Sequence, residues 1–190
     1  MEAKEDQRRR YKREISGIAK ENLVYIDESG IDRTSYKNRG WGKKGEVLLG
    51  KTSGKRFIRT NIIAAQCGNK ILAPMTFKGS CDTRLFVAWI KQMLIPELKS
   101  GQTVVMDNAS FHKSPLVREA IESAECKLVY LPPYSPDLNP IEKFWANLKR
   151  WINQHLSHME DIHKAITFFF ISSPGLCYAT ISCSMSYMYI

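Results

Sequence analysis

The sequence predicts an α/β domain built on a mixed five-stranded sheet flanked by helices. Three observations predict this fold class. Five short apolar stretches are typical of strands, longer segments repeat their apolar residues at helical spacing, and the two kinds alternate along the second half of the chain. With 190 residues, of which 44% are hydrophobic and 25% charged, the chain can bury the core of one such domain.

The first half of the chain predicts three strands. Residues 22–27 form the first apolar stretch, and residues 29–46, rich in turn-forming and basic residues, are expected to leave the sheet as an excursion. Two further stretches, 56–66 and 71–77, flank the Gly-Asn pair at 68–69, which is typical of a β-hairpin turn. We therefore expect antiparallel pairing in this half.

The second half alternates helices and strands. Residues 82–98 predict a helix with one apolar face and Asp82 as its N-cap, and a short buried strand follows at 103–107. A second helix is predicted at 114–124 and a last strand at 127–131. Strands that are joined through a helix pair in parallel, so the whole sheet is expected to be mixed.

A long amphipathic helix is predicted after the proline-rich segment "LPPYSPDLNPIE" at 131–142. Its apolar residues recur at helical spacing within 139–156: Ile141, Phe144, Trp145, Leu148, Trp151 and Ile152. A further helix is expected to begin at Ser157, with Glu160 completing a capping box.

The C-terminal residues 166–190 carry no charge and are long enough for a membrane span. Pro174, Gly175 and several serines argue against a span, and the last residues alternate in polarity as a strand does. We therefore expect no membrane partner and interpret this segment as an atypical tail.

The charge balance suggests a polyanionic partner, with a merely soluble basic protein as the alternative from charge alone. The formal net charge is +9, from 28 Lys and Arg against 19 Asp and Glu, and nucleic acid is the first partner that such an excess suggests. Residues 1–20 hold a basic run that we interpret as a linker or N-terminal extension. The five cysteines are scattered and odd in number, and the charged N-terminus does not resemble a secretory signal, so a reducing, intracellular location is expected.

Three carboxylates stand at positions where they can build a site. Asp27 and Asp107 each end an apolar strand, where α/β sheets bind ligands, although an aspartate there can equally begin a turn. Glu142 follows Asn139 at the N-cap and Pro140 at the first helical position, so it can be a structural part of a cap. The prolines before it also restrict the backbone and fix the direction of its carboxylate.

Together the three acids suggest a metal site. Hard cations such as Mg²⁺ prefer carboxylate oxygens and keep several waters. Two such ions about 3.5–4 Å apart can activate a nucleophile and stabilise the leaving oxygen of a phosphoryl displacement. Without a cation, clustered carboxylates would repel one another, and at least one pKa would rise.

Three segments resemble the catalytic domain of DDE transposases, in particular the bacterial insertion-sequence type related to the mariner superfamily. They read "YIDESG", "VVMDNASFHKS" and "LVYLPPYSPDLNPIEKFWANLKR". In this sequence 34 residues separate Asp107 from Glu142, which is the spacing of that group, and "RGWGKKGE" is similar to its excursion after the first strand. The match covers 20–156, and the proline-rich block is its most specific part.

The resemblance implies a ribonuclease H-like fold in which the first and fourth strands are neighbours. It implies three residues that are both catalytic and metal-binding, with two Mg²⁺ ions for which Mn²⁺ can substitute: Asp27, Asp107 and Glu142. Further positions of the family motif are matched by candidate supporting residues: Asn108, His112 and Asn139. His112 can equally be a satisfied loop histidine.

The implied activity is metal-dependent cleavage of DNA at transposon ends, followed by strand transfer. The resemblance further implies terminal inverted repeats and TA target sites as DNA partners, a homodimer on DNA, and a cytoplasmic, nucleoid-associated location in bacteria. We expect DNA contacts from the basic residues of the last long helix: Lys143, Lys149 and Arg150. Lys149 lies two turns from Glu142 and shares its helix face.

The expected organisation has three parts: a basic extension at 1–20, the catalytic domain at 21–156, and a helix with an atypical uncharged tail at 157–190. Complete relatives carry N-terminal helix-turn-helix modules, for which 20 residues are too few. An alternative function is therefore a catalytically idle, truncated remnant that binds DNA or full-length copies as a regulator. A structure-selective ribonuclease on the same fold is a third interpretation.

Overall fold

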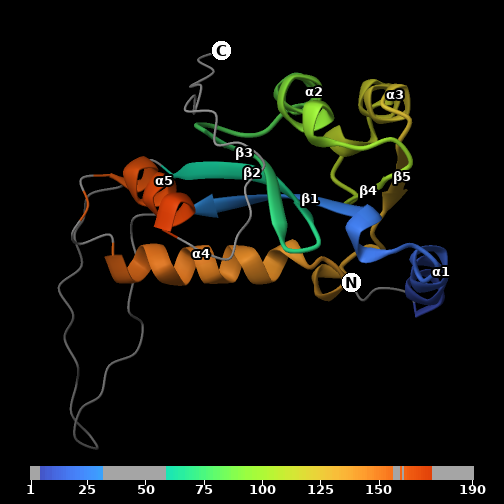
Figure 1. The fold of residues 1–190 in the computed structure, drawn as a ribbon, viewed down its shortest axis with the longest axis horizontal. Helices are drawn as coiled ribbons and strands as arrows, with labels where there is room; N and C mark the ends of the chain where they lie inside the picture. Colours follow the sequence, from blue (N-terminus) through green and yellow to red (C-terminus); the bar gives the residue numbers. More distant parts are fainter. Residues whose placement is uncertain (1–4, 32–58, 156–158, 160, 173–190) are drawn as a thin grey trace, which may run out of the picture.

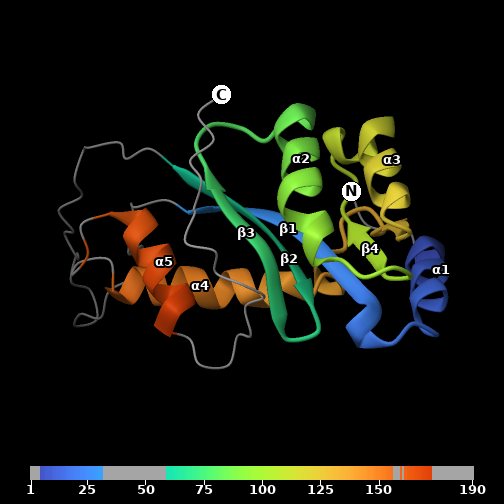
Figure 2. The same ribbon diagram turned by 45° about the horizontal axis from the view of Figure 1, so that its top comes forward.

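Helices cover both faces of one mixed five-stranded sheet (Figures 1 and 2). The computed structural model describes residues 5–31, 59–155, 159 and 161–172. The strands are β1 (Leu23–Ile31), β2 (Thr60–Cys67), β3 (Lys70–Phe77), β4 (Thr103–Met106) and β5 (Lys127–Tyr130). The helices are α1 (Glu5–Ile15), α2 (Thr83–Trp89), α3 (Pro115–Ser123), α4 (Ile141–His155) and α5 (Ile162–Ser172).

The strand order is β3-β2-β1-β4-β5, which confirms the predicted mixed sheet. β2 and β3 form the predicted hairpin, and Cys67 pairs with Lys70 across a two-residue turn. Gly68 in this turn has a φ of +57°, a conformation that suits glycine. β1 pairs antiparallel with β2 and parallel with β4, and β5 completes the parallel part. The first and fourth strands are therefore neighbours.

β1 is longer than the sequence predicted. The predicted strand ended at Asp27, but β1 continues to Ile31. Its antiparallel partner β2 supplies pairing along this outer half, whereas the parallel partner β4 pairs only as far as Tyr25. Residues 29–31 therefore belong to the sheet, and the remainder of the predicted excursion, from residue 32, lies outside the described residues.

Successive side chains of β1 point to opposite faces of the sheet. Val24 and Ile26 are buried in the cluster formed with α2 and α3. Leu23 and Tyr25 are buried on the other face, against α1. α4 lies on this second side of the sheet, away from α2 and α3 (Figure 1). The two faces of β1 thus meet different helices.

α2 is capped as predicted. Oδ1 of Asp82 accepts a hydrogen bond from the backbone N–H of Leu85 at 2.8 Å. The indole Nε1 of the fully buried Trp89 donates to the carbonyl of Ala73 in β3, also at 2.8 Å. The predicted helical segment continues past α2 as a π-helical turn at Ile90–Leu94 and a 3₁₀ turn at Ile95–Glu97.

Most of the N-terminal segment that we interpreted as a linker forms a helix docked on the sheet. Tyr11 of α1 is 4% exposed and packs in the same cluster as Val129 of β5. Arg8 donates to Oγ of Ser135 at 3.0 Å and forms an ion pair with Asp137. α1 therefore contacts both the sheet and the proline-rich segment.

The C-terminal helix begins later than expected. α5 starts at Ile162, and Oδ1 of Asp161 accepts a hydrogen bond from the backbone N–H of Lys164 at 2.8 Å. The capping residues predicted at Ser157 and Glu160 lie outside the described residues, as does the tail from residue 173. Among the described residues, no helix is long and apolar enough to cross a membrane.

If α1 belongs to the folded domain, Tyr11→Ala will destabilise the whole domain. Deleting a large buried aromatic side chain leaves a cavity, so we expect a loss of about 3 kcal/mol in the free energy of unfolding. Urea unfolding followed by circular dichroism measures this loss. Gln7→Ala, an exposed position of the same helix, is the control and should change stability by less than about 0.5 kcal/mol. Equal stabilities of the two variants would contradict a docked α1.

Candidate active site

The pairing of β1 with β4 brings two of the predicted acids level with each other. Tyr25 pairs with Val105 in a parallel ladder, and Asp27 and Asp107 each stand two residues further along. β4 ends at Met106, so Asp107 is the first residue beyond its strand. The register therefore places the two acids side by side, where the parallel pairing ends.

The third acid reaches the same place from the first turn of α4. Glu142 follows the proline-rich segment, and that segment forms a wall of a cavity of about 430 Å³. Five of the six residues predicted to act at or to support the site line this cavity: Asp27, Asp107, Asn108, Asn139 and Glu142. The sixth, His112, is buried behind Asp107.

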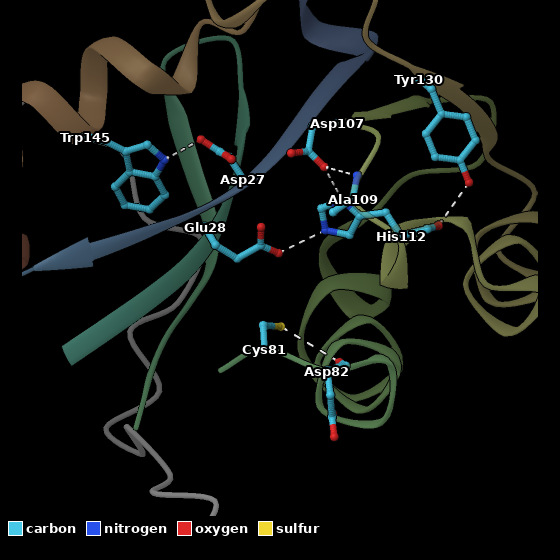
Figure 3. Close-up of polar contacts among 9 residues, drawn as sticks. All are labelled: Asp27, Glu28, Cys81, Asp82, Asp107, Ala109, His112, Tyr130 and Trp145. Atoms are coloured by element: carbon cyan, nitrogen blue, oxygen red, sulfur yellow. Dashed lines mark hydrogen bonds and ion pairs between the residues drawn. The ribbon is translucent and has the colours of Figure 1, made fainter. Parts of the chain in front are cut away.

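Asp27 lies on the face of the sheet that α4 covers. The indole Nε1 of Trp145 donates to its Oδ2 at 3.0 Å (Figure 3). Burial raises the pKa of Asp27, and the negative charges of Glu142 and Glu28 raise it further, to about 7. Near neutral pH this carboxyl group is therefore only partly ionised, and a cation in the cavity would favour its charged form.

Asp107 is held by two hydrogen bonds that converge on one oxygen. Its Oδ1 accepts from the backbone N–H of Ala109 at 2.8 Å and from Nδ1 of His112 at 2.6 Å (Figure 3). Burial by itself favours the neutral acid, but these hydrogen bonds lower the pKa of Asp107 below its ordinary value. Half of the side chain remains exposed, so an ionised carboxylate faces the cavity.

His112 is fully buried and joins two carboxylates. Its ring packs against Phe86 and Phe111, and its Nε2 donates to Oε1 of Glu28 at 3.0 Å. Because both partners are carboxylates, the imidazole donates from both nitrogens and is charged. Burial by itself lowers the pKa of His112, but the hydrogen bonds to Asp107 and Glu28 outweigh it and raise the pKa to about 9. The histidine therefore contacts one of the predicted metal ligands.

The proline-rich wall is held by side chains from other segments. Nδ2 of Asn108 donates to the carbonyl of Leu131, where β5 runs into the wall. Tyr134 turns the chain with a φ of +55°, a strained conformation for a residue other than glycine. Arg8 of α1 holds the wall from the other side through Ser135 and Asp137. The wall is thus fixed at its beginning and in its middle.

The cap predicted at Asn139 does not form through its side chain. Its backbone carbonyl accepts from the N–H of Glu142 at 3.3 Å, but its Oδ1 is buried without a hydrogen-bond partner among the described residues. Buried polar atoms are normally satisfied. Asn139 is one of the residues that line the same cavity as the carboxylates, so its unpaired oxygen is a candidate acceptor for a water beside the site.

The donor set fits a hard divalent cation. Carboxylates from three segments line one cavity, and Mg²⁺ prefers such oxygen ligands. In the described part of the chain, no three His, Cys, Asp or Glu side chains lie close enough to hold an ion as they stand. Mg²⁺ keeps several waters and is commonly held by one or two carboxylates, so a complete protein cage is not required.

The basic residues predicted to contact DNA do not line this cavity. Lys143, Lys149 and Arg150 are exposed on α4, in the turns that follow Glu142.

A second, wider cavity of about 720 Å³ shares Asp107 with the first and is bordered by Glu28, Arg59 and Phe111, among others.

Two contacts at this site were not predicted from the sequence. Trp145 was interpreted as part of the core, and it is 1% exposed, but its indole also binds Asp27. Glu28 was not considered, although it directly follows Asp27 in "YIDESG". The alternation of side chains along β1 was the available signal, because it sends Glu28 to the opposite face from Asp27.

Comparisons with known proteins identify the fold. Solved structures of Mos1 transposase superpose on the chain at 15–17% identity. A paired-end complex with the left transposon end gives a TM-score of 0.68 over 92% of this chain and 57% of that one, at 15% identity. The Mos1 catalytic domain with Raltegravir and Mg gives 0.58 over 91% and 86%, at 16% identity. This likeness confirms the expected ribonuclease H-like fold.

The chain thus spans little more than half of the longer Mos1 chains that it resembles. No curated protein matches it in sequence. The family model described as "DDE superfamily endonuclease" matches residues 22–163, which is most of the chain. The sequence motifs, the sheet and the cavity all lie within this range, and the chain belongs to the DDE superfamily of endonucleases.

Proposed function

We propose that this chain is the catalytic domain of a DDE transposase, which cleaves DNA and joins strands at transposon ends. One observation carries the proposal: three carboxylates predicted from distant sequence motifs line one cavity, from β1, from the end of β4 and from the start of α4. Asp27, Asp107 and Glu142 are the proposed metal ligands. Mg²⁺ is the proposed ion, with Mn²⁺ as a substitute, and the chemistry calls for two ions.

In the proposed mechanism the metal ions supply the activation of water and the neutralisation of charge on the phosphodiester. The protein positions the carboxylates that would hold the ions. Asp107 is kept ionised by His112 and Ala109, and Trp145 orients the carboxylate of Asp27. The raised pKa of Asp27 means that binding of a cation will release a proton near neutral pH. The proline-rich wall limits where a DNA strand can enter the cavity.

The proposed partners are DNA segments: terminal inverted repeats as substrates and TA dinucleotides as targets. Two features of the chain support DNA as the partner, namely its net charge of +9 and the exposed basic residues beside Glu142 on α4. The Mos1 structures that resemble the chain include paired-end and strand transfer complexes. We propose that this chain likewise acts as a homodimer on paired ends, in the cytoplasm at the nucleoid.

Nicking of supercoiled plasmid by the purified chain tests the proposal. With Mg²⁺ or Mn²⁺ the wild type should convert supercoiled DNA to open circles. Asp107→Asn and Glu142→Gln should lower the rate by more than about 100-fold, beyond the roughly 10–100-fold that loss of an outer partner costs at a metal site. Glu122→Gln, an exposed carboxylate on α3, is the matched control and should nick at the wild-type rate.

Two outcomes would contradict this function. Equal nicking by the wild type and by Asp107→Asn would assign the activity to a contaminant. No nicking by a folded wild type, with DNA binding intact, would support instead the idle remnant that binds DNA as a regulator.

The face of α4 that carries Glu142 should contact phosphates through Lys149. Removing one such contact releases about one counterion fewer, so Lys149→Ala should weaken DNA binding and reduce the slope of log K against log salt by about 1. Fluorescence anisotropy of a labelled duplex at several salt concentrations measures this slope. Lys91→Ala, exposed next to α2 on the other side of the sheet, should leave the slope unchanged. An unaltered slope for Lys149→Ala would exclude the contact.

A further inference from the structure

Glu28 is a fourth carboxylate close to the cavity, and the proposed metal set does not use it. It follows Asp27 in β1, where it is paired with Ile63 of β2. The pleat of the strand sends its side chain to the face of α2, away from Asp27 (Figure 3). The side chain is 19% exposed, and its Oε1 accepts the hydrogen bond from Nε2 of His112 at 3.0 Å.

Asp107 needs support from outside its own strand. The pairing of β4 with β5 ends at Met106, whose carbonyl accepts the N–H of Leu131. Beyond that point no strand fixes the backbone, and the direction of the Asp107 carboxylate depends on its bonds to Ala109 and His112. Both bonds use Oδ1, so they leave the other carboxylate oxygen to the cavity.

His112 is held firmly enough for its contact with Glu28 to affect the direction of the Asp107 carboxylate. Phe86 and Phe111 pack on its ring, with centroids 4.4 and 4.3 Å away. The hydroxyl of Tyr130 donates to its backbone carbonyl at 3.0 Å. These contacts hold the backbone and limit the space around the ring, and the bond from Nε2 to Glu28 is a second hydrogen bond, besides that of Nδ1 to Asp107, that opposes rotation of the ring.

We propose that Glu28 is a positioning residue for Asp107. By holding Nε2 of His112 it keeps Nδ1 on Oδ1 of Asp107 and leaves the second carboxylate oxygen turned toward the cavity. The contacts from Glu28 to His112 and from His112 to Asp107 thus link β1, which pairs with β2, to the end of β4. The inference rests on the proposed role of Asp107 as a metal ligand.

Binding of Mn²⁺ alone tests this role without measuring catalysis. The free-ion signal in electron paramagnetic resonance gives the dissociation constant for the whole chain and its variants. Glu28→Ala should weaken Mn²⁺ binding by about 10-fold or more, as loss of an outer hydrogen-bond partner does at other metal sites. Glu28→Gln keeps an oxygen that accepts from Nε2, and should restore the affinity to within about threefold of the wild type. Glu122→Gln, far from the cavity, should bind as the wild type does.

The Gln variant separates positioning from charge. Both substitutions remove the negative charge of Glu28, and only Gln retains the acceptor. Equal weakening by Ala and Gln would overturn the positioning role, because general electrostatic attraction would then explain the loss.

A double-mutant comparison tests whether Glu28 acts through the histidine, and its His112→Asn arm remains informative should Glu28→Ala not fold. In His112→Asn the shorter side chain no longer reaches Glu28, so His112→Asn should itself weaken Mn²⁺ binding about 10-fold, and Glu28→Ala should cause no further loss in that background. Normal affinity in His112→Asn would overturn the inference.

Failure of the inference and failure of the proposed function give different results. If Asp107→Asn abolishes Mn²⁺ binding while Glu28→Ala leaves it intact, Asp107 is a ligand and Glu28 does not position it. If the wild type and Asp107→Asn bind Mn²⁺ equally, Asp107 is not a ligand, and the metal site and the inference are both overturned.

Discussion

The double pairing of β1 is the constraint on which the site depends. On one side β1 runs parallel to β4, and this register sets Asp27 level with Asp107. On the other side it pairs antiparallel with β2 for its full outer half, and this pairing holds Asp27 and Glu28 in extended backbone beyond the point where β4 stops. A slip of one residue would exchange the faces of Asp27 and Glu28, so neither the cavity nor the contact with His112 would survive.

The carboxylates on the two faces of β1 have different charged neighbours. On the α4 face, Asp27 and Glu142 repel each other within a partly buried cavity, and the pKa of Asp27 rises to about 7. On the α2 face, Asp107 and Glu28 share the charged His112, and the pKa of Asp107 falls. The protein therefore keeps Asp107 ionised, whereas Asp27 is only partly ionised near neutral pH and would become fully ionised on binding a cation.

Most of the fold was predictable because its signals are local. The Gly-Asn turn, the capping residue Asp82 and the apolar stripe of α4 all form as expected from spacing alone. The true end of β1 was not predictable, because it depends on pairing with β2 across a long separation in sequence. The contacts of Glu28 and Trp145 also needed the tertiary structure. Their side chains meet partners 84 and 118 residues away, and no spacing rule relates such residues.

The wall of the cavity explains why α1 belongs to the domain. Residues 132–140 lie outside every strand, so no ladder of backbone hydrogen bonds sets their position. The prolines restrict φ but do not place the segment against the sheet. Asn108 ties its beginning to the end of β4, and Arg8 ties its middle to α1, while Tyr11 anchors α1 to the sheet. The position of Glu142 therefore depends on the N-terminal helix as well as on α4.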